Sequence, residues 1–200
     1  MGLVEKELLH QETGPEDMYQ TIKLMLLKAQ IFAKAGLPQK GFSLSIRAAA
    51  LAHRARYLNI LWEAIGTLSK VLCSLSDFEA AIQLLKSIMP RVLETDDGEM
   101  IANSHSYLAD AYMGLAGKDG KDGSSKRKEQ MNKVLECLDR AFDEYSRLDH
   151  VTGQCEMLAK KATIMYLNGD LVLANDVASK YLGIKRAVRE EVDEGGGIAA

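Results

Sequence analysis

The chain has 200 residues, of which 47% are apolar and 26% charged, and this composition is typical of a folded protein rather than a disordered one. Its formal net charge of −3 lacks the basic excess that most nucleic-acid-binding domains carry, so nucleic acid is not an expected partner. It contains no run of about 18 apolar residues that could span a membrane. The three cysteines form no C-x-x-C pair, which favours buried thiols in a reducing compartment. We therefore expect a protein of the nucleus and cytoplasm.

Helix-forming residues dominate the chain, and apolar residues recur at helical spacing in successive pairs of segments. We expect residues 1–18 to be a helical or disordered lead-in and residues 19–56 to form a first helical hairpin. Gly36 lies between the two helices of this hairpin, where a left-handed turn would suit it. Pro38 stands in the first turn of the second helix, where its missing N–H costs nothing.

Residues 57–95 predict a second hairpin with a short turn. Asp77, or Ser76 before it, is the expected N-cap of the second helix. The apolar residues of that helix follow the i, i+3, i+4, i+7 spacing of a single helical face; they are Phe78, Ala81, Ile82, Leu85, Ile88 and Met89.

A third pair of helices is expected over residues 98–149, and it contains the stretch GKDGKDGSSK at positions 117–126. A Walker-type phosphate loop needs Gly, four residues and then Gly-Lys-Ser/Thr. The Gly-Lys pairs of this stretch fail the pattern, because Tyr112 and Leu115 stand where the first glycine belongs. We therefore expect residues 117–128 to be a flexible, hydrophilic loop inserted in the turn of the third hairpin.

Residues 151–183 predict a fourth hairpin with its turn at residues 168–170, and residues 184–200 predict the end of its second helix and a flexible tail. The second helices can be aligned at the small or medium-sized residue that opens each apolar stripe. The aligned residues, spaced 40, 53 and 40 positions apart, are Gly41, Ala81, Val134 and Ala174. The long interval contains the insertion, as in repeat arrays whose insertions fall in turns.

A period of about 40 with two helices per unit fits either a long tetratricopeptide-type or a HEAT-type repeat. The segment SYLADAYMGLAG favours the former, because Leu108, Ala109 and Tyr112 match the core of a tetratricopeptide first helix. The match is weak at one position, where the tetratricopeptide pattern has tryptophan. The four units of this chain have other residues there, namely Met25, Ile65, His105 and Leu158. We predict an all-α fold, a tetratricopeptide-like right-handed superhelical solenoid of about four helical hairpins. At its core position, His105 is expected to pack with its ring hydrogen-bonded.

The chain resembles the C-terminal tetratricopeptide region of the family of subunit five of the anaphase-promoting complex. The resemblance spans roughly residues 19–185 and rests on three segments in order, KAQIFAKAGLPQKGFSLSIRAAALAHRARYL, LSDFEAAIQLLKSIMPRVLE and NKVLECLDRAFDEYSRLDHVTGQCEMLAKKATIMYLNGD. It implies a non-catalytic scaffold subunit of this cell-cycle ubiquitin ligase, with the other subunits as partners. Full-length members of the family are much longer and carry N-terminal helical domains.

The residues themselves predict no catalytic, cofactor or metal site. A Cys/His enzyme needs the pair brought together by an orienting third group, and the possible pairs are Cys73 with His53 and Cys155 with His150. The apolar surroundings of Cys73 favour a structural thiol instead. The four histidines are scattered along the chain, whereas zinc ligands cluster. We expect no small-molecule substrate.

The sharpest charge feature is the interval 18–62, which contains no acidic residue and seven basic ones: Lys23, Lys28, Lys34, Lys40, Arg47, Arg54 and Arg56. The simplest interpretation is a solvated face. The functional interpretation is that the first hairpin docks against an acidic neighbouring subunit. In that case Lys40, Arg47, Arg54 and Arg56 are the expected partner contacts.

The alternative function is a free tetratricopeptide adaptor that binds a peptide or helix in its concave groove. An adaptor that grips a terminal carboxylate would line its inner face with Lys, Arg and Asn. The expected inner-face positions have mixed charge instead, which favours the scaffold; they are Lys23, Leu26, Gln30, Glu63, Gly66, Lys70, Asn103, Ser106 and Asp110.

Overall fold

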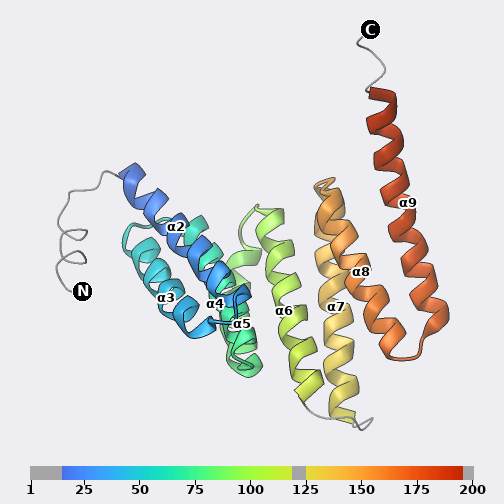
Figure 1. Ribbon diagram of the computed structural model, residues 1–200, viewed down its shortest axis with the longest axis horizontal. Helices are drawn as coiled ribbons and strands as arrows, with labels where there is room; N and C mark the ends of the chain where they lie inside the picture. The colour runs from blue at the N-terminus through green and yellow to red at the C-terminus, as the bar shows by residue number, and fades with distance from the viewer. Residues whose placement is uncertain (1–14, 119–124, 196–200) are drawn as a thin grey trace. The chain divides into compact units, whose positions relative to one another are not determined.

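A computed structural model of the chain describes residues 15–118 and 125–195. Over these residues the backbone forms eight helices and no strand, which confirms the predicted all-α fold class. Contacts within the chain divide it into two compact units, Met1–Leu75 and Ser76–Ala200. Figure 1 labels the helices in chain order.

The first unit contains three helices, α2 (Pro15–Lys34), α3 (Pro38–Arg54) and α4 (Leu58–Ser74), and each packs against the other two. The buried core of the unit includes a cluster formed by Ile22, Leu26, Ala48, Ala52, Ile60 and Ala64. Helices α2 and α3 approach closely at Gly41, because a Cβ atom there would lie 2.8 Å from the carbonyl oxygen of Ala29. A residue without a side chain is therefore needed at this crossing.

Several turn residues have the roles that the sequence predicts. Gly36 adopts a left-handed backbone with φ of 76° between α2 and α3, and Pro38 occupies the first turn of α3. Gly169 adopts φ of 87° in the turn that follows α8. The side chain of Asp77 accepts a hydrogen bond of 3.2 Å from the Ala80 N–H and is thus the predicted N-cap.

Three further turn residues are left-handed although they are not glycines: Arg56 (φ 58°), Ser76 (φ 61°) and Asp149 (φ 51°). Arg56 and Asp149 are 93 positions apart, and so are Ser76 and Gly169. The interval of 93 positions is the sum of two spacings in the alignment of second helices, 53 and 40. The same turn geometry therefore recurs at the intervals that the sequence repeats predict.

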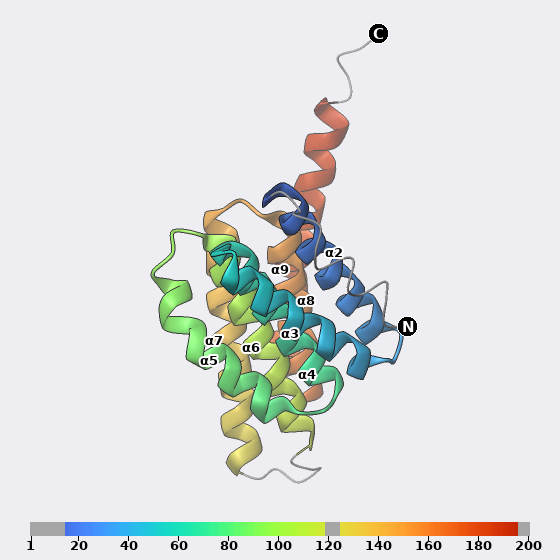
Figure 2. The ribbon, with the colours of Figure 1, turned by 90° about the vertical axis from the view of Figure 1, so that its left-hand side faces the viewer.

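The second unit contains α5 (Phe78–Leu93), α6 (Gly98–Lys118), α7 (Ser125–Arg147), α8 (Val151–Leu167) and α9 (Leu171–Gly195). Each helix packs against the next one along the chain, and α6, α7 and α8 lie side by side in Figure 1. The C-terminal end of α9 extends beyond α8 in both views (Figures 1 and 2). Buried apolar residues between these helices include Ala109, Leu115, Val134, Leu138, Ala141, Met157, Leu158 and Ile164.

The insertion expected over residues 117–128 is shorter than predicted. Helix α6 continues to Lys118 and α7 begins at Ser125, so both ends of the expected loop are helical, and residues 119–124 lie outside the described residues. The early start of α7 has a local cause. Its first turns contain good helix formers, and the Lys133 ammonium pairs with Glu129 Oε1 at 2.5 Å in the i, i+4 arrangement that supports a helix.

The described residues include only part of the two terminal segments expected at residues 1–18 and 184–200. Residues 15–18 of the lead-in belong to α2, and residues 184–195 belong to α9, while residues 1–14 and 196–200 lie outside the described residues. Of the helices described, none combines the length and the apolar character that crossing a membrane requires.

Candidate functional site

Three of the four predicted partner-contact residues form a line along α3. Lys40, Arg47 and Arg54 follow one another at intervals of seven residues, which places them on one stripe of the helix. The buried stripe of α3, formed by Gly41, Ser45, Ala48 and Ala52, lies on another face. All three cations are exposed, and so is Arg56 in the turn after the helix. We call Lys40, Arg47 and Arg54 the basic stripe of α3.

The ends of the basic stripe have different surroundings. The ammonium of Lys40 lies 5.7 Å from the centre of the Phe32 ring of α2, within reach of a cation–π interaction. Arg54 is the last residue of α3, where the helix dipole favours a positive charge. Helix α3 contains no acidic residue. Its exposed charge is therefore of one sign along the whole helix.

Two of the expected inner-face residues of the first unit, Lys23 and Glu63, bind each other, and a third, Gln30, binds a neighbouring residue of α4. The Lys23 ammonium lies 2.6 Å from Glu63 Oε2, and this hydrogen bond and the attraction between the charges raise the pKa of Lys23 despite partial burial. The side-chain amide of Gln30 donates a hydrogen bond of 3.3 Å to Thr67 Oγ1. These contacts join α2 to α4, and they neutralise the one acidic residue among the expected inner-face positions of this unit.

A small cavity of about 180 Å³ lies beside these contacts in the first unit. It is lined by Gln30, Ala33 and Lys34 of α2 and by Thr67, Lys70, Val71 and Ser74 of α4. Lys34 and Lys70 thus contribute to it from facing helices, but most of its lining is apolar.

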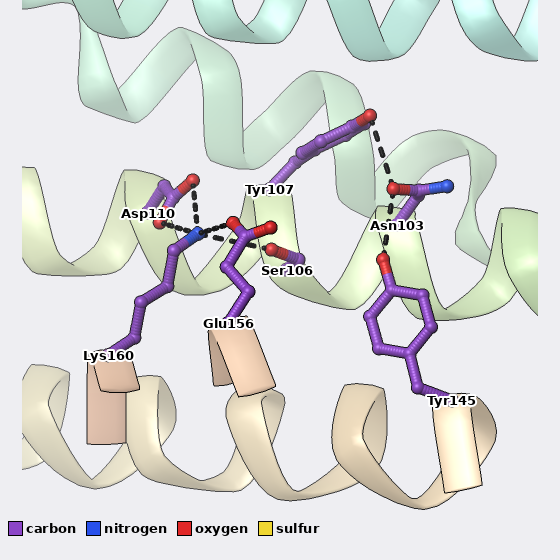
Figure 3. A network of polar contacts seen from close by, with 7 residues as sticks. All are labelled: Asn103, Ser106, Tyr107, Asp110, Tyr145, Glu156 and Lys160. Atoms are coloured by element: carbon purple, nitrogen blue, oxygen red, sulfur yellow. Dashed lines mark hydrogen bonds and ion pairs between the residues drawn. The ribbon is translucent and has the colours of Figure 1, made fainter. Parts of the chain in front are cut away.

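A network of polar side chains joins three helices of the second unit (Figure 3). On α6, Asn103, Ser106, Tyr107 and Asp110 lie on one face at i, i+3, i+4 and i+7. The ammonium of Lys160 on α8 lies 2.8 Å from Asp110 Oδ1 and 3.1 Å from Asp110 Oδ2, and it donates a hydrogen bond of 3.3 Å to Ser106 Oγ. Glu156 Oε1 lies 3.1 Å from the same ammonium.

The other half of the network centres on Asn103. Tyr145 of α7 donates a hydrogen bond of 3.1 Å to Asn103 Oδ1, and the Tyr107 hydroxyl lies 3.5 Å from the same oxygen. Burial raises the pKa of the Tyr145 hydroxyl to about 12, so the hydroxyl stays protonated and donates at neutral pH.

The charge of Lys160 is held within this network. Burial lowers the pKa of its ammonium, but attraction to Asp110 and hydrogen bonds to Asp110 and Glu156 outweigh this effect, and the net pKa is raised. The ammonium therefore remains charged and is surrounded by oxygen atoms of its own chain. It is positioned to fix α8 against α6 rather than to attack a substrate or to release a proton.

The structure thus brings together three of the predicted inner-face residues, Asn103, Ser106 and Asp110, and adds partners that the sequence prediction missed. Lys160 is the main omission. A shift of 53 positions, the interval across the insertion, carries the expected position Asn103 onto Glu156, but it reaches Lys160 only from Tyr107, which was not an expected inner-face position.

His105 is buried in α6, with 5% of its surface exposed, as its core position predicts. The prediction that the ring is hydrogen-bonded is wrong for Nδ1, because this buried atom has no hydrogen-bond partner among the described residues. Burial and the positive charge of Arg140 lower the pKa of His105, while Glu144 and Glu136 oppose this shift. The ring is therefore neutral at neutral pH.

The pair of Cys155 with His150 considered from the sequence gains no support. His150 caps α8, with Nδ1 accepting a hydrogen bond of 3.0 Å from the Gly153 N–H, and its ring stacks on Tyr145. That nitrogen is committed to the backbone and cannot serve Cys155 as a base. The third cysteine, Cys137, has its pKa raised to about 11 by burial, which makes it a poor nucleophile.

A cavity of about 460 Å³ lies between α8 and α9 in the second unit. Its lining combines apolar and polar groups: Val151, Thr152, Cys155, Glu156, Ala159, Tyr181, Lys185, Val188 and Arg189. A second cavity of about 410 Å³ lies between the start of α7 and the turn from α8 to α9, and Arg127 and Lys128 contribute to it. Neither cavity contains a nucleophile paired with a base.

Within residues 15–118 and 125–195, no three His, Cys, Asp or Glu side chains gather closely enough to hold a metal ion. A comparison of the sequence with models of protein families gave no match, and a comparison with curated protein sequences gave no significant one.

Proposed function

We propose that this chain is a non-catalytic scaffold subunit of the anaphase-promoting complex, the cell-cycle ubiquitin ligase, and that it acts in the nucleus and cytoplasm. In this proposal the helices form a tetratricopeptide-like right-handed superhelical solenoid of about four hairpins. The partners are other subunits of the ligase. Catalytic, cofactor and metal roles have no part in it.

The observation that carries the proposal is the basic stripe of α3. Lys40, Arg47 and Arg54 are exposed in line on a helix without acidic residues. Exposed helices normally gain stability from i, i+4 pairs of opposite charge, as α7 does with Glu129 and Lys133. A line of like charges gives up this stabilisation, and it is well suited to an acidic surface on a partner, where complementary charge fixes register and speeds encounter.

The inner face supports the same proposal. Two lysines that could hold a peptide carboxylate, Lys23 and Lys160, are paired with Glu63 and Asp110 of the same chain. A peptide would have to displace these internal pairs before it could use either ammonium. This favours a scaffold over an adaptor that grips peptide termini.

The experiment is charge reversal of the basic stripe. The variant K40E/R47E/R54E should keep its helicity by circular dichroism, because all three side chains are exposed, and it should be incorporated into the ligase about tenfold or more less efficiently. Arg56 is left unchanged because it lies in the turn after α3, outside the basic stripe. The matched control is K180E/R186E/R189E, which reverses three exposed cations of α9. Undiminished incorporation of the α3 variant would contradict the proposal.

The adaptor function remains the second candidate because of the cavity between α2 and α4. Lys34 and Lys70 both line it, and a lysine ammonium can pair with the terminal carboxylate of a peptide. The test is a titration with short peptides that carry either a free or an amidated C-terminus. Binding that needs the free carboxylate and is lost in Lys34→Met would favour the adaptor.

A further inference from the structure

The outward face of α2 is apolar. Leu24, Leu27 and Ile31 are 65%, 54% and 56% exposed and follow the i, i+3, i+7 spacing of one helical face. The core-facing residues of the same helix, Ile22, Leu26 and Ala29, are at most 1% exposed. At about 100° per residue, the mean directions of these two sets differ by about 170°. We call Leu24, Leu27 and Ile31 the outer stripe of α2.

Lysines flank the outer stripe on both sides. The same helical geometry puts Lys28 along one edge and Lys34 along the other, and both are exposed. The Lys28 ammonium lies 5.9 Å from the centre of the Phe32 ring, within reach of a cation–π interaction. From position 18 to the end of α2 the helix contains no acidic residue.

An apolar row between rows of charge is the arrangement by which one helix recognises another. The row supplies the buried seam, and the flanking charges select the partner. Single exposed leucines are common, but three in register on one face form a row that a folded chain seldom leaves in water.

We propose that the outer stripe of α2 binds an amphipathic helix of a partner protein, and that acidic residues flank the apolar seam of that helix. A second copy of this chain is a poor occupant, because its Lys28 and Lys34 would meet the same lysines across the seam. The inference rests on the proposed scaffold function in one respect, which is that the partner is a protein. It concerns a different helix from the basic stripe of α3.

The test uses a synthetic helical peptide of about 21 residues with leucines at the seam positions and glutamates beside them. A twin peptide carries lysines in place of the glutamates. Fluorescence anisotropy with the full chain should show binding of the acidic peptide and at least about tenfold weaker binding of the twin. Equal affinity for the two peptides, or no binding of the acidic one, would overturn the proposal.

Variants locate the site. L24S/L27S should weaken binding of the acidic peptide at least about tenfold, whereas Leu182→Ser, at an equally apolar position of α9 that is 51% exposed, should not. K28E/K34E should reverse the preference so that the lysine peptide binds better than the acidic one. Unchanged binding by either double variant would overturn the proposal. Sedimentation that shows a dimer of the wild-type chain, lost in L24S/L27S, would assign the stripe to a second copy and overturn it too.

The same peptide separates this inference from the proposed function. K40E/R47E/R54E leaves the outer stripe intact, so it should bind the acidic peptide at least half as tightly as the wild-type chain does. If this variant is incorporated normally into the ligase while L24S/L27S loses the peptide, the proposed function fails and the inference stands. If the incorporation result supports the function but the peptide binds both double variants as it binds the wild type, the inference alone fails.

Discussion

The ammonium of Lys160 on α8 lies 2.8 Å from Oδ1 of Asp110 on α6, and the two residues are 50 positions apart. The contact joins helices that are not consecutive in the chain, since α7 lies between them in sequence. Asp110 and Lys160 are half-buried, so water screens their attraction less than it would at the surface. The ion pair therefore fixes how the third and fourth pairs of helices meet within the second unit.

Removal of this ion pair should destabilise the second unit. We expect Asp110→Asn to lower the free energy of unfolding by about 1 kcal/mol, and Lys160→Met by a similar amount, because each leaves a half-buried partner without its counter-charge. The double variant should lose less than the two single losses combined. Urea denaturation followed by circular dichroism measures all three. Strictly additive losses would show that the two side chains do not interact, and Glu129→Gln, in the exposed Glu129–Lys133 pair of α7, serves as the control.

Gly153 and Gly183 should respond in opposite ways to alanine. A Cβ atom at position 153 would lie 2.5 Å from the Tyr145 ring and 2.7 Å from His150 Nδ1, so Gly153→Ala should cost about 1–3 kcal/mol. At position 183, within α9, nothing lies within 4 Å of the added atom, and Gly183→Ala should stabilise the unit by about 0.5–1 kcal/mol. Thermal unfolding of both variants provides the comparison. A stable Gly153→Ala variant would contradict the packing of α7 on α8.

The burial of His105 predicts acid sensitivity. Its folded-state pKa lies below the ordinary value of 6.5, so the unfolded chain takes up a proton first as the pH falls. The contribution of His105 to stability is thus complete above pH 6.5 and is lost as the pH falls from there towards the folded-state pKa. His105→Leu should flatten the decline in unfolding free energy between about pH 7 and 5, a range above the ordinary pKa of carboxyl groups. An unchanged decline in the variant would contradict this account.

The cysteines should react slowly in the folded chain. Burial raises the pKa of Cys137 to about 11, which keeps its thiol protonated at neutral pH, and Cys155 is only 8% exposed, which limits access to its thiol. Iodoacetamide at pH 7.5 should label both only after urea is added, as peptide mass spectrometry can show. Rapid labelling of Cys155 in the native chain would instead indicate that the cavity between α8 and α9 admits reagents.

Local features of the fold were predictable from the sequence. Gly36, Pro38 and Asp77 act through their own backbone and their nearest neighbours, so their roles at turns and caps follow from residue type and position. The extent of the insertion was less predictable. Glycines and charges mark a loop, but the glutamate and lysine at positions 129 and 133 also favour helix, and α7 begins at Ser125.

The polar contacts were harder to predict, because they depend on how helices pack. Lys160 pairs with Asp110 across an interval that includes the insertion, and a sequence alignment of first helices would have to cross that gap to find it. For His105, helical periodicity correctly predicted burial but could not reveal whether a partner faces the ring. Periodicity specifies the face of a helix, whereas hydrogen bonds depend on distances of tenths of an ångström.

Affinity purification of the full chain from dividing cells, with co-purifying proteins identified by mass, tests the central claim most directly. The scaffold account predicts that the wild-type chain recovers subunits of the anaphase-promoting complex in amounts close to its own. With K40E/R47E/R54E as the purified chain, the amount of these subunits recovered should fall at least about tenfold. Recovery of the wild-type chain without any subunit of that ligase would contradict the account.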